Sequence, residues 1–258
     1  MTAVDVLAAR PADTGVPLGR LLRVELRKLL DTRAGLWLLA AVGLLTAAAV
    51  GIYLFAAEPG RLTFRDFVDV TVLPQATLLP VLGILAVTTE WTQRTGLVTH
   101  ALEPNRGRVL AMKFAATGIF GALAIGLALA AAAVGNVLGM AMFDGNGSWA
   151  YGATGLRDTL LYQGLSLLQG LALGALLMNT AAALVGYFVL PTVFYLLFTL
   201  VDGLQGAAPW IDLGTSQDPL LSHTIGGVEW LQLSATTVWW ILLPLAAGVW
   251  RLLHREIK

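Results

Sequence analysis

The segment Leu36–Ala57, LWLLAAVGLLTAAAVGIYLFAA, contains 22 residues and no charged side chain. Because an α-helix rises about 1.5 Å per residue, this length matches the roughly 30 Å hydrocarbon core of a bilayer. The segment begins too far from Met1, and after too many charges, to be the apolar region of a signal peptide. It therefore predicts a membrane-spanning helix.

The composition of the whole chain agrees with this interpretation. Of its 258 residues, 57% are hydrophobic and 12% are charged, and the mean hydropathy is +0.75. A soluble domain carries about 25% charged residues to solvate its surface, so most of this exterior must face lipid. The formal net charge of zero gives no strong field to attract nucleic acid. The absence of cysteine excludes disulfides, thiolate catalysis and thiolate metal sites.

Five further apolar stretches predict five further spans, and none shows the alternation of a membrane β-barrel. The second stretch contains Pro74 and Pro80, which membrane helices tolerate when neighbouring groups satisfy the freed carbonyls. The third stays uncharged to Phe143, too far for one straight span, so we expect a break near Gly135 and Asn136.

The long uncharged run of residues 159–201 has room for two spans, and we expect a tight hairpin between them at Asn179-Thr180. The fold class is then all-α, a single transmembrane domain over residues 18–258 after a flexible cytoplasmic tail over residues 1–17. The predicted spans lie at about 36–57, 70–89, 111–134, 158–178, 181–201 and 233–253.

The basic residues predict the orientation, because Lys and Arg concentrate in cytoplasmic segments. With six spans and the N-terminus inside, only Arg61, Arg65 and Arg157 fall on the outer side. The inner side holds thirteen: Arg10, Arg20, Arg23, Arg27, Lys28, Arg33, Arg94, Arg106, Arg108, Lys113, Arg251, Arg255 and Lys258. We therefore expect both termini in the cytoplasm. The richness in Ala, Gly and Leu, with Arg preferred over Lys, suggests a bacterial cell membrane.

Three segments between the spans carry further patterns. Residues 18–33 place five leucines on one helical face and basic residues elsewhere, which predicts an amphipathic helix in the inner interface or, more simply, a positive-inside anchor. Residues 89–113 predict a short cytoplasmic helix, a turn at Pro104 and Gly107, and a re-entering span; a solvated connector is the alternative. Residues 202–232 are too apolar for a free coil and predict short external helices.

Motifs for chemistry are absent from the sequence. It has no Gly-x-x-x-x-Gly-Lys-Ser/Thr phosphate loop, no Gly-x-Ser-x-Gly elbow and no His-Glu-x-x-His. Its three histidines are far apart, so we expect no metal site and no catalytic residue. Every Asp, Glu, Lys and Arg is expected at or beyond a span end, which leaves no place to couple an ion.

Neutral polar and small residues are the remaining candidates within the spans. The polar ones predict a path for an amphiphilic or apolar solute: Gln75, Thr77, Gln163, Gln169, Tyr187 and Tyr195. Small residues at a spacing of four allow close helix packing. Packing within the chain is the default interpretation, and a subunit interface is the alternative for Gly43, Ala47, Gly51, Ala182 and Gly186.

Two segments resemble the type-2 permeases of ATP-binding-cassette (ABC) exporters. One is Glu25-Leu26-Arg27-Lys28-Leu29, directly before the first span, and the other is the loop that follows the second span. The resemblance implies an elbow helix that includes Glu25, Arg27 and Lys28. It also implies a coupling helix that docks into an ATPase, with Glu90, Arg94, Gly96, Leu97, Glu103, Pro104 and Arg106 in the coupling region.

The resemblance implies a permease subunit, not itself an enzyme, that exports a hydrophobic or amphiphilic compound such as a drug, antibiotic, peptide or lipid. Two cytoplasmic ATPase subunits would supply the energy, and a second permease, identical or homologous, would complete the transporter in the lipid membrane. No cofactor is expected in this chain; ATP and magnesium would bind the ATPase partner. The alternatives are a non-transporting membrane scaffold or sensor that binds a cytoplasmic partner, and an intramembrane enzyme.

Overall fold

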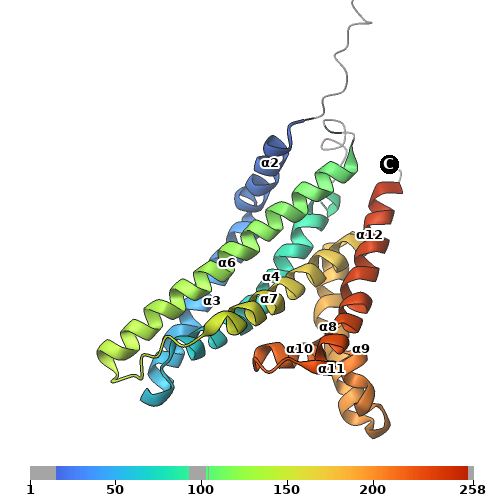
Figure 1. The fold of residues 1–258 in the computed structure, drawn as a ribbon. Coiled ribbons are helices and arrows are strands. Elements are labelled where there is room, and N and C mark those ends of the chain that lie inside the picture. Colours follow the sequence, from blue (N-terminus) through green and yellow to red (C-terminus); the bar gives the residue numbers. More distant parts are fainter. Residues whose placement is uncertain (1–15, 93–102, 104, 255–258) are drawn as a thin grey trace, which may run out of the picture.

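The computed structural model describes residues 16–92, 103 and 105–254, and this part of the chain is helical, without strands (Figure 1). The long helices are α3 (Arg33–Ala56), α4 (Phe64–Thr92), α6 (Arg106–Met142), α7 (Gly152–Leu177) and α8 (Thr180–Leu200). The shorter elements are α2 (Leu18–Asp31), η1 (Pro59–Arg61), η2 (Asp202–Ala207), α9 (Ala208–Ile211), α10 (Leu213–Leu221), α11 (Gly227–Thr237), η3 (Val238–Leu242) and α12 (Leu243–His254).

Six helices in the described part of the chain are long and apolar enough to cross a membrane. They are the five long helices and the continuous unit 227–254, formed by α11, η3 and α12. The chain is thus a polytopic helical protein, as its sequence predicts. Helix α2 and the end of α12 lie at the same end of the bundle, and α9, α10 and α11 lie at the other (Figure 1).

Helices α4 and α7 form the centre of the bundle. In the most apolar part of each, 56% of the residues are buried, against 11% in α8. Glycines make the contact possible, because a Cβ at Gly170 would lie 2.1 Å from the carbonyl oxygen of Pro80, and one at Gly174 would lie 3.1 Å from the Cα of Ile84. These glycines serve packing within the chain, which was their default interpretation.

Proline is accommodated inside α4 in the manner that membrane helices require. Because Pro80 has no N–H, the carbonyl of Ala76, four residues earlier, loses its partner in the helix. The hydroxyl of Tyr187 on α8 donates to that carbonyl at 3.2 Å. A side chain from a neighbouring span thus satisfies the freed group, and α4 continues to Thr92.

The expected break near Gly135 and Asn136 is wrong, because α6 runs without interruption to Met142. Both residues are buried, and each has a packing role. A Cβ at Gly135 would lie within 3 Å of the side chains of Val50 and Phe67, so glycine lets α3 and α4 approach. Asn136 donates from Nδ2 to the carbonyl of Gly147 at 3.3 Å. These two residue types serve close packing here instead of ending a helix.

The other expected connections agree with the structure. Helix α7 ends at Leu177, Met178 adopts a left-handed conformation, and the side chain of Asn179 caps α8 by accepting from the amide of Ala182 at 2.9 Å. The segment between α8 and α11 folds into η2, α9 and α10, and its apolar composition predicted short helices there. The amphipathic helix ends at Asp31, two residues before its predicted end.

Candidate functional site

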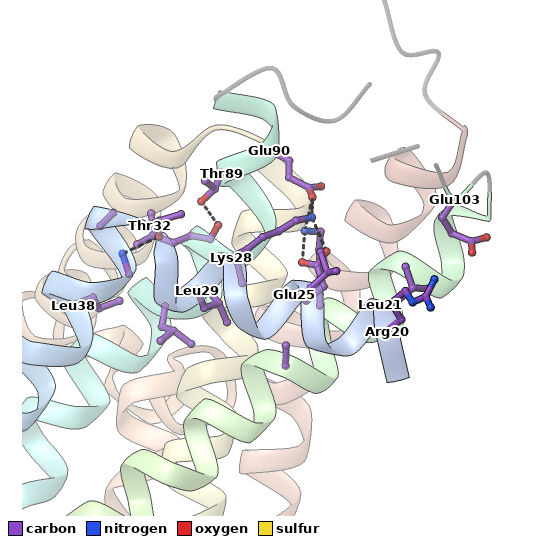
Figure 2. Close-up of a pocket in the computed structure, with 18 of the residues that line it drawn as sticks. Arg20, Leu21, Glu25, Lys28, Leu29, Thr32, Leu38, Thr89, Glu90 and Glu103 are labelled. Carbon is purple, nitrogen blue, oxygen red and sulfur yellow. Dashed lines mark hydrogen bonds and ion pairs between the residues drawn. The ribbon is translucent and has the colours of Figure 1, made fainter. Parts of the chain in front are cut away.

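Four charged side chains from three helices form an ion network at the end of the bundle where α4 ends and α6 begins (Figure 2). Lys113 Nζ on α6 lies 2.8 Å from Glu25 Oε2 on α2 and 3.0 Å from Glu90 Oε1 on α4. Lys28 Nζ, also on α2, lies 2.7 Å from Glu25 Oε1 and 2.5 Å from Glu90 Oε1. The four formal charges sum to zero.

Burial makes this network a firm link between the helices. Glu25, Glu90 and Lys113 are each at most 7% exposed, whereas Lys28 keeps part of its side chain in contact with the exterior. Burial alone would lower the pKa of Lys28, but attraction to Glu25 and Glu90 and hydrogen bonds to both raise it above its usual value. Removing one partner from such a buried group leaves an unmatched charge, which costs about 3–5 kcal/mol.

The local sequence fixes the position of α2 that the network requires. Of the five leucines on the predicted face, Leu29 is buried and Leu22 and Leu26 are partly buried against the core, whereas Leu18 and Leu30 are exposed. At the elbow, Thr32 Oγ1 accepts from the amide of Gly35 at 3.1 Å and begins α3. A Cβ at Gly35 would lie 1.9 Å from the carbonyl oxygen of Leu29, so only glycine allows this corner.

A second set of contacts at the same end involves the described residues just before and within the first turn of α6. Glu103 is 2% exposed and accepts from the amide of Val16 at 2.8 Å and from Arg108 Nη1 at 3.3 Å. Arg106 Nη1 donates to the carbonyl of Leu252 on α12 at 3.1 Å. The start of α6 is thereby joined to the chain before α2 and to α12.

The residues assigned to the coupling region separate into two groups. Arg94, Gly96, Leu97 and Pro104 lie outside the described residues. Glu90, Glu103 and Arg106 make the contacts above, within the chain. Contact of this region with an ATPase stays a prediction. In the elbow set, Glu25 and Lys28 belong to the network, and Arg27 is exposed.

Lys113 is the network member to which the sequence assigned no role, although the loop that resembles the permeases ends with it. A lysine near a span end, with acidic residues at the neighbouring ends, is the signal that would have found it. Charges buried near a membrane interface require partners.

The polar residues assigned to a solute path do not all come together. Thr77, Gln169 and Tyr187 line a cavity of ≈ 300 Å³ between α4, α7, α8, α10 and η3. Gln75 is instead a packing residue, because its Nε2 donates to the carbonyl of Ala124 at 2.9 Å and to Thr46 Oγ1 at 3.3 Å. Gln163 is fully buried and neither polar atom of its amide has a partner among the described residues. Tyr195 is 60% exposed.

A second ion network lies at the opposite end of the bundle. His223, after α10, lies between Asp69 of α4 and Asp158 of α7, with Nε2 3.2 Å from Asp69 and Nδ1 3.4 Å from Asp158. Arg157 Nη2 lies 2.6 Å from the fully buried Asp158 and stacks on the ring of Trp230 at 5.1 Å. The segment that follows α10 is thus tied to the two central helices.

Asp69 and Asp158, which were expected at or beyond a span end, lie near the starts of α4 and α7. Helices α4 and α7 begin about one and a half turns earlier than the predicted spans, so both residues lie inside helices. Within the described residues, no group of three or more His, Asp or Glu side chains is arranged to hold a metal ion. Both ring nitrogens of His223 face carboxylates instead.

The small residues considered for a subunit interface lie mainly on the outside of the bundle. A Cβ added at Gly43 or Gly51 would meet nothing within 4 Å, and Ala47 and Ala182 are exposed. Gly186 makes only ordinary contact with Leu177 and Leu190. These positions are open to lipid or to another subunit, and the interface stays a prediction.

No protein-family model matches the chain, and searches of curated proteins and of solved structures found no match either. The six apolar helices and the charged networks at the two ends of the bundle therefore define its class: a multi-pass helical membrane protein.

Proposed function

We propose that this chain is the membrane subunit of an ATP-driven exporter of a hydrophobic or amphiphilic compound, with the ATPase on a separate chain. The observation that carries the proposal is the buried network of Glu25, Lys28, Glu90 and Lys113. It joins the elbow helix to the last turn of α4 and the early turns of α6, which flank the proposed coupling loop.

The network suits this function mechanically. A partner that binds the loop between α4 and α6 can change the arrangement of the spans only if the loop is rigidly connected to them. Buried charges that neutralise one another supply such a connection. Separating one of them from the rest would leave an unmatched charge where water cannot solvate it. Helix α2 therefore moves with α4 and α6 as a unit.

The character of the solute follows from the cavity between α4, α7, α8, α10 and η3. Its lining is largely apolar, with the neutral polar side chains of Gln169, Gln217 and Tyr162 among it and one acidic residue, Asp212. The Asp212 carboxylate caps α10 by accepting from the amide of Thr215 at 2.9 Å, so it is already engaged. An amphiphilic solute with hydrogen-bonding groups suits such a surface.

The test begins with the full-length chain, purified from its native membrane in mild detergent. A co-purifying ATPase that carries a phosphate loop is expected, and in nanodiscs its ATP hydrolysis should depend on the membrane chain. Arg94→Glu should reduce that dependence without reducing the amount of membrane chain. The control Arg23→Glu reverses an exposed charge on α2 that is not in the elbow set and should have no effect.

Two results would contradict the proposal. If no ATPase associates, the alternative of a scaffold or sensor is favoured. If an ATPase associates but ATP drives no uptake of a fluorescent lipophilic dye into inverted vesicles, the chain binds an ATPase without exporting amphiphiles.

A further inference from the structure

A large apolar cavity lies beneath the elbow helix, apart from the cavity considered for the solute. Its volume is ≈ 690 Å³, and its walls come from α2, α3, α4 and α6 (Figure 2). It shares no lining residue with the cavity between α4, α7 and α8. Ligand sites in proteins have volumes of roughly 300–1,000 Å³, so this cavity is large enough for a specific occupant.

Helix α2 cannot collapse into this space, because it is fixed at two places. The ion network holds Glu25 and Lys28 against α4 and α6. Directly after it, at the C-terminal end of α2, the backbones meet at the corner between Leu29 and Gly35, where a Cβ would lie 1.9 Å from a carbonyl oxygen. Protein interiors contain few voids larger than a water molecule, and empty apolar space forfeits dispersion energy. The cavity therefore calls for an apolar filling.

The lining changes from apolar to charged along the cavity. The apolar end is formed by Leu38, in the first turns of span α3, with Leu82, Leu85 and Ala86 of span α4. The charged end is formed by Arg20, near the start of α2, and Glu103 (Figure 2). Since α3 and α4 are membrane spans and α2 is not, the apolar end lies deeper in the bilayer than the charged end.

One cation at the charged end is left unmatched. Lys28 and Lys113 pair with Glu25 and Glu90, and Glu103 pairs with Arg108. The exposed guanidinium of Arg20 has no hydrogen bond or ion pair with the described residues. Arginine binds phosphate oxygens through two parallel hydrogen bonds. The cavity thus offers an apolar channel with an anion-binding group at its mouth.

We propose that this cavity binds one phospholipid from the leaflet in which α2 lies. One acyl chain lies along Leu38, Leu82 and Leu85, and the phosphate pairs with Arg20. The order of chemical groups in a phospholipid matches the order of the lining, from the headgroup region to the hydrocarbon. The lipid fills the space that the fixed position of α2 leaves, and it is a resident component, distinct from a transported solute.

The experiment uses the full-length chain in nanodiscs of phosphatidylglycerol and phosphatidylethanolamine, released into detergent and analysed by native mass spectrometry. The wild type should keep one phospholipid per chain after loosely bound lipid is removed. Arg20→Glu should weaken retention about tenfold, the size expected for one lost charge-assisted contact. The control Arg23→Glu makes the same change at an exposed position on α2 that does not line the cavity.

A second pair of variants tests the apolar end. Ala86→Phe places a ring in the cavity and should displace the acyl chain, whereas Ala48→Phe, at an exposed position on α3, should not. Because Arg20 is exposed, its variant tests the proposal even if Ala86→Phe fails to fold. A wild type that keeps no phospholipid, equal loss in Arg20→Glu and Arg23→Glu, or a retained molecule without phosphate would overturn the inference. Neither readout involves ATP or transport, so the result is independent of the proposed function.

Discussion

Replacing Lys113 by methionine tests whether the network of Glu25, Lys28, Glu90 and Lys113 stabilises the fold. Methionine keeps most of the length of lysine but removes the charge, so Glu25 and Glu90 then share only Lys28. Glu25 Oε2 loses the contact that Lys113 makes at 2.8 Å. Both carboxylates are at most 7% exposed, so water cannot solvate the excess negative charge. We expect the free energy of unfolding to fall by about 3–5 kcal/mol.

The assay is reversible unfolding of the purified chain in mixed micelles with increasing dodecyl sulfate, followed by tryptophan fluorescence. A second substitution sharpens the reasoning. Glu25→Gln in the Lys113→Met background restores charge balance, because the Glu90–Lys28 pair remains at 2.5 Å. The double variant should therefore be about 1–2 kcal/mol more stable than Lys113→Met alone, because the effects of residues in contact do not add.

The control is Arg27→Met, which removes an exposed cation from α2 and should change stability by no more than about 0.5 kcal/mol. If Lys113→Met lowers the free energy of unfolding no more than Arg27→Met does, the network does not stabilise the fold. If the loss of stability in the double variant equals the sum of the losses in Glu25→Gln and Lys113→Met, the two residues act independently, which also contradicts the proposed network.

Three further substitutions test other contacts by the same unfolding assay. Gly170→Ala should cost about 1–3 kcal/mol, because its Cβ would lie 2.1 Å from the carbonyl oxygen of Pro80, whereas Gly164→Ala, with open space around it, should be neutral or stabilising. Tyr187→Phe should cost about 0.5–1.5 kcal/mol by leaving the carbonyl freed by Pro80 without its donor; an unchanged stability would assign that carbonyl another partner. The raised pKa of Lys28 means that its ammonium stabilises the fold fully below pH 10.5 and loses this effect as the pH rises through the higher folded-state pKa. The stability difference between wild type and Lys28→Met should therefore be constant near neutral pH and shrink above about pH 10.5, and a difference that grows there would contradict the direction of the shift.

The spans were predictable because each is a local property of the sequence. A run of some 20 apolar residues needs no knowledge of its neighbours to be identified. The hairpin at Asn179 was also local, since a side chain that caps the following helix is favoured at that position. The same local reasoning failed at Gly135 and Asn136, because their roles depend on Val50, Phe67 and Gly147 in other segments.

The networks could be predicted only in part, because their members are far apart in the sequence. Lys28 and Glu90 are separated by 62 positions, and Glu25 and Lys113 by 88. The sequence identified Glu25, Lys28 and Glu90 from the family resemblance but not their mutual contact. The role of Gln75 depends on distant residues for the same reason: a neutral amide within a span can line a path or join helices, and in the structure its Nε2 donates to the carbonyl of Ala124.

The separation of Glu25 from Lys113 has a consequence for biogenesis. The elbow helix leaves the ribosome well before its partners, so it cannot take its final place until the third span has been made. Until then, Glu25 and Glu90 have only the ammonium of Lys28 to share, and the network carries one excess negative charge. The synthesis of Lys113 supplies the second cation, so the network reaches charge balance only when the third span is made.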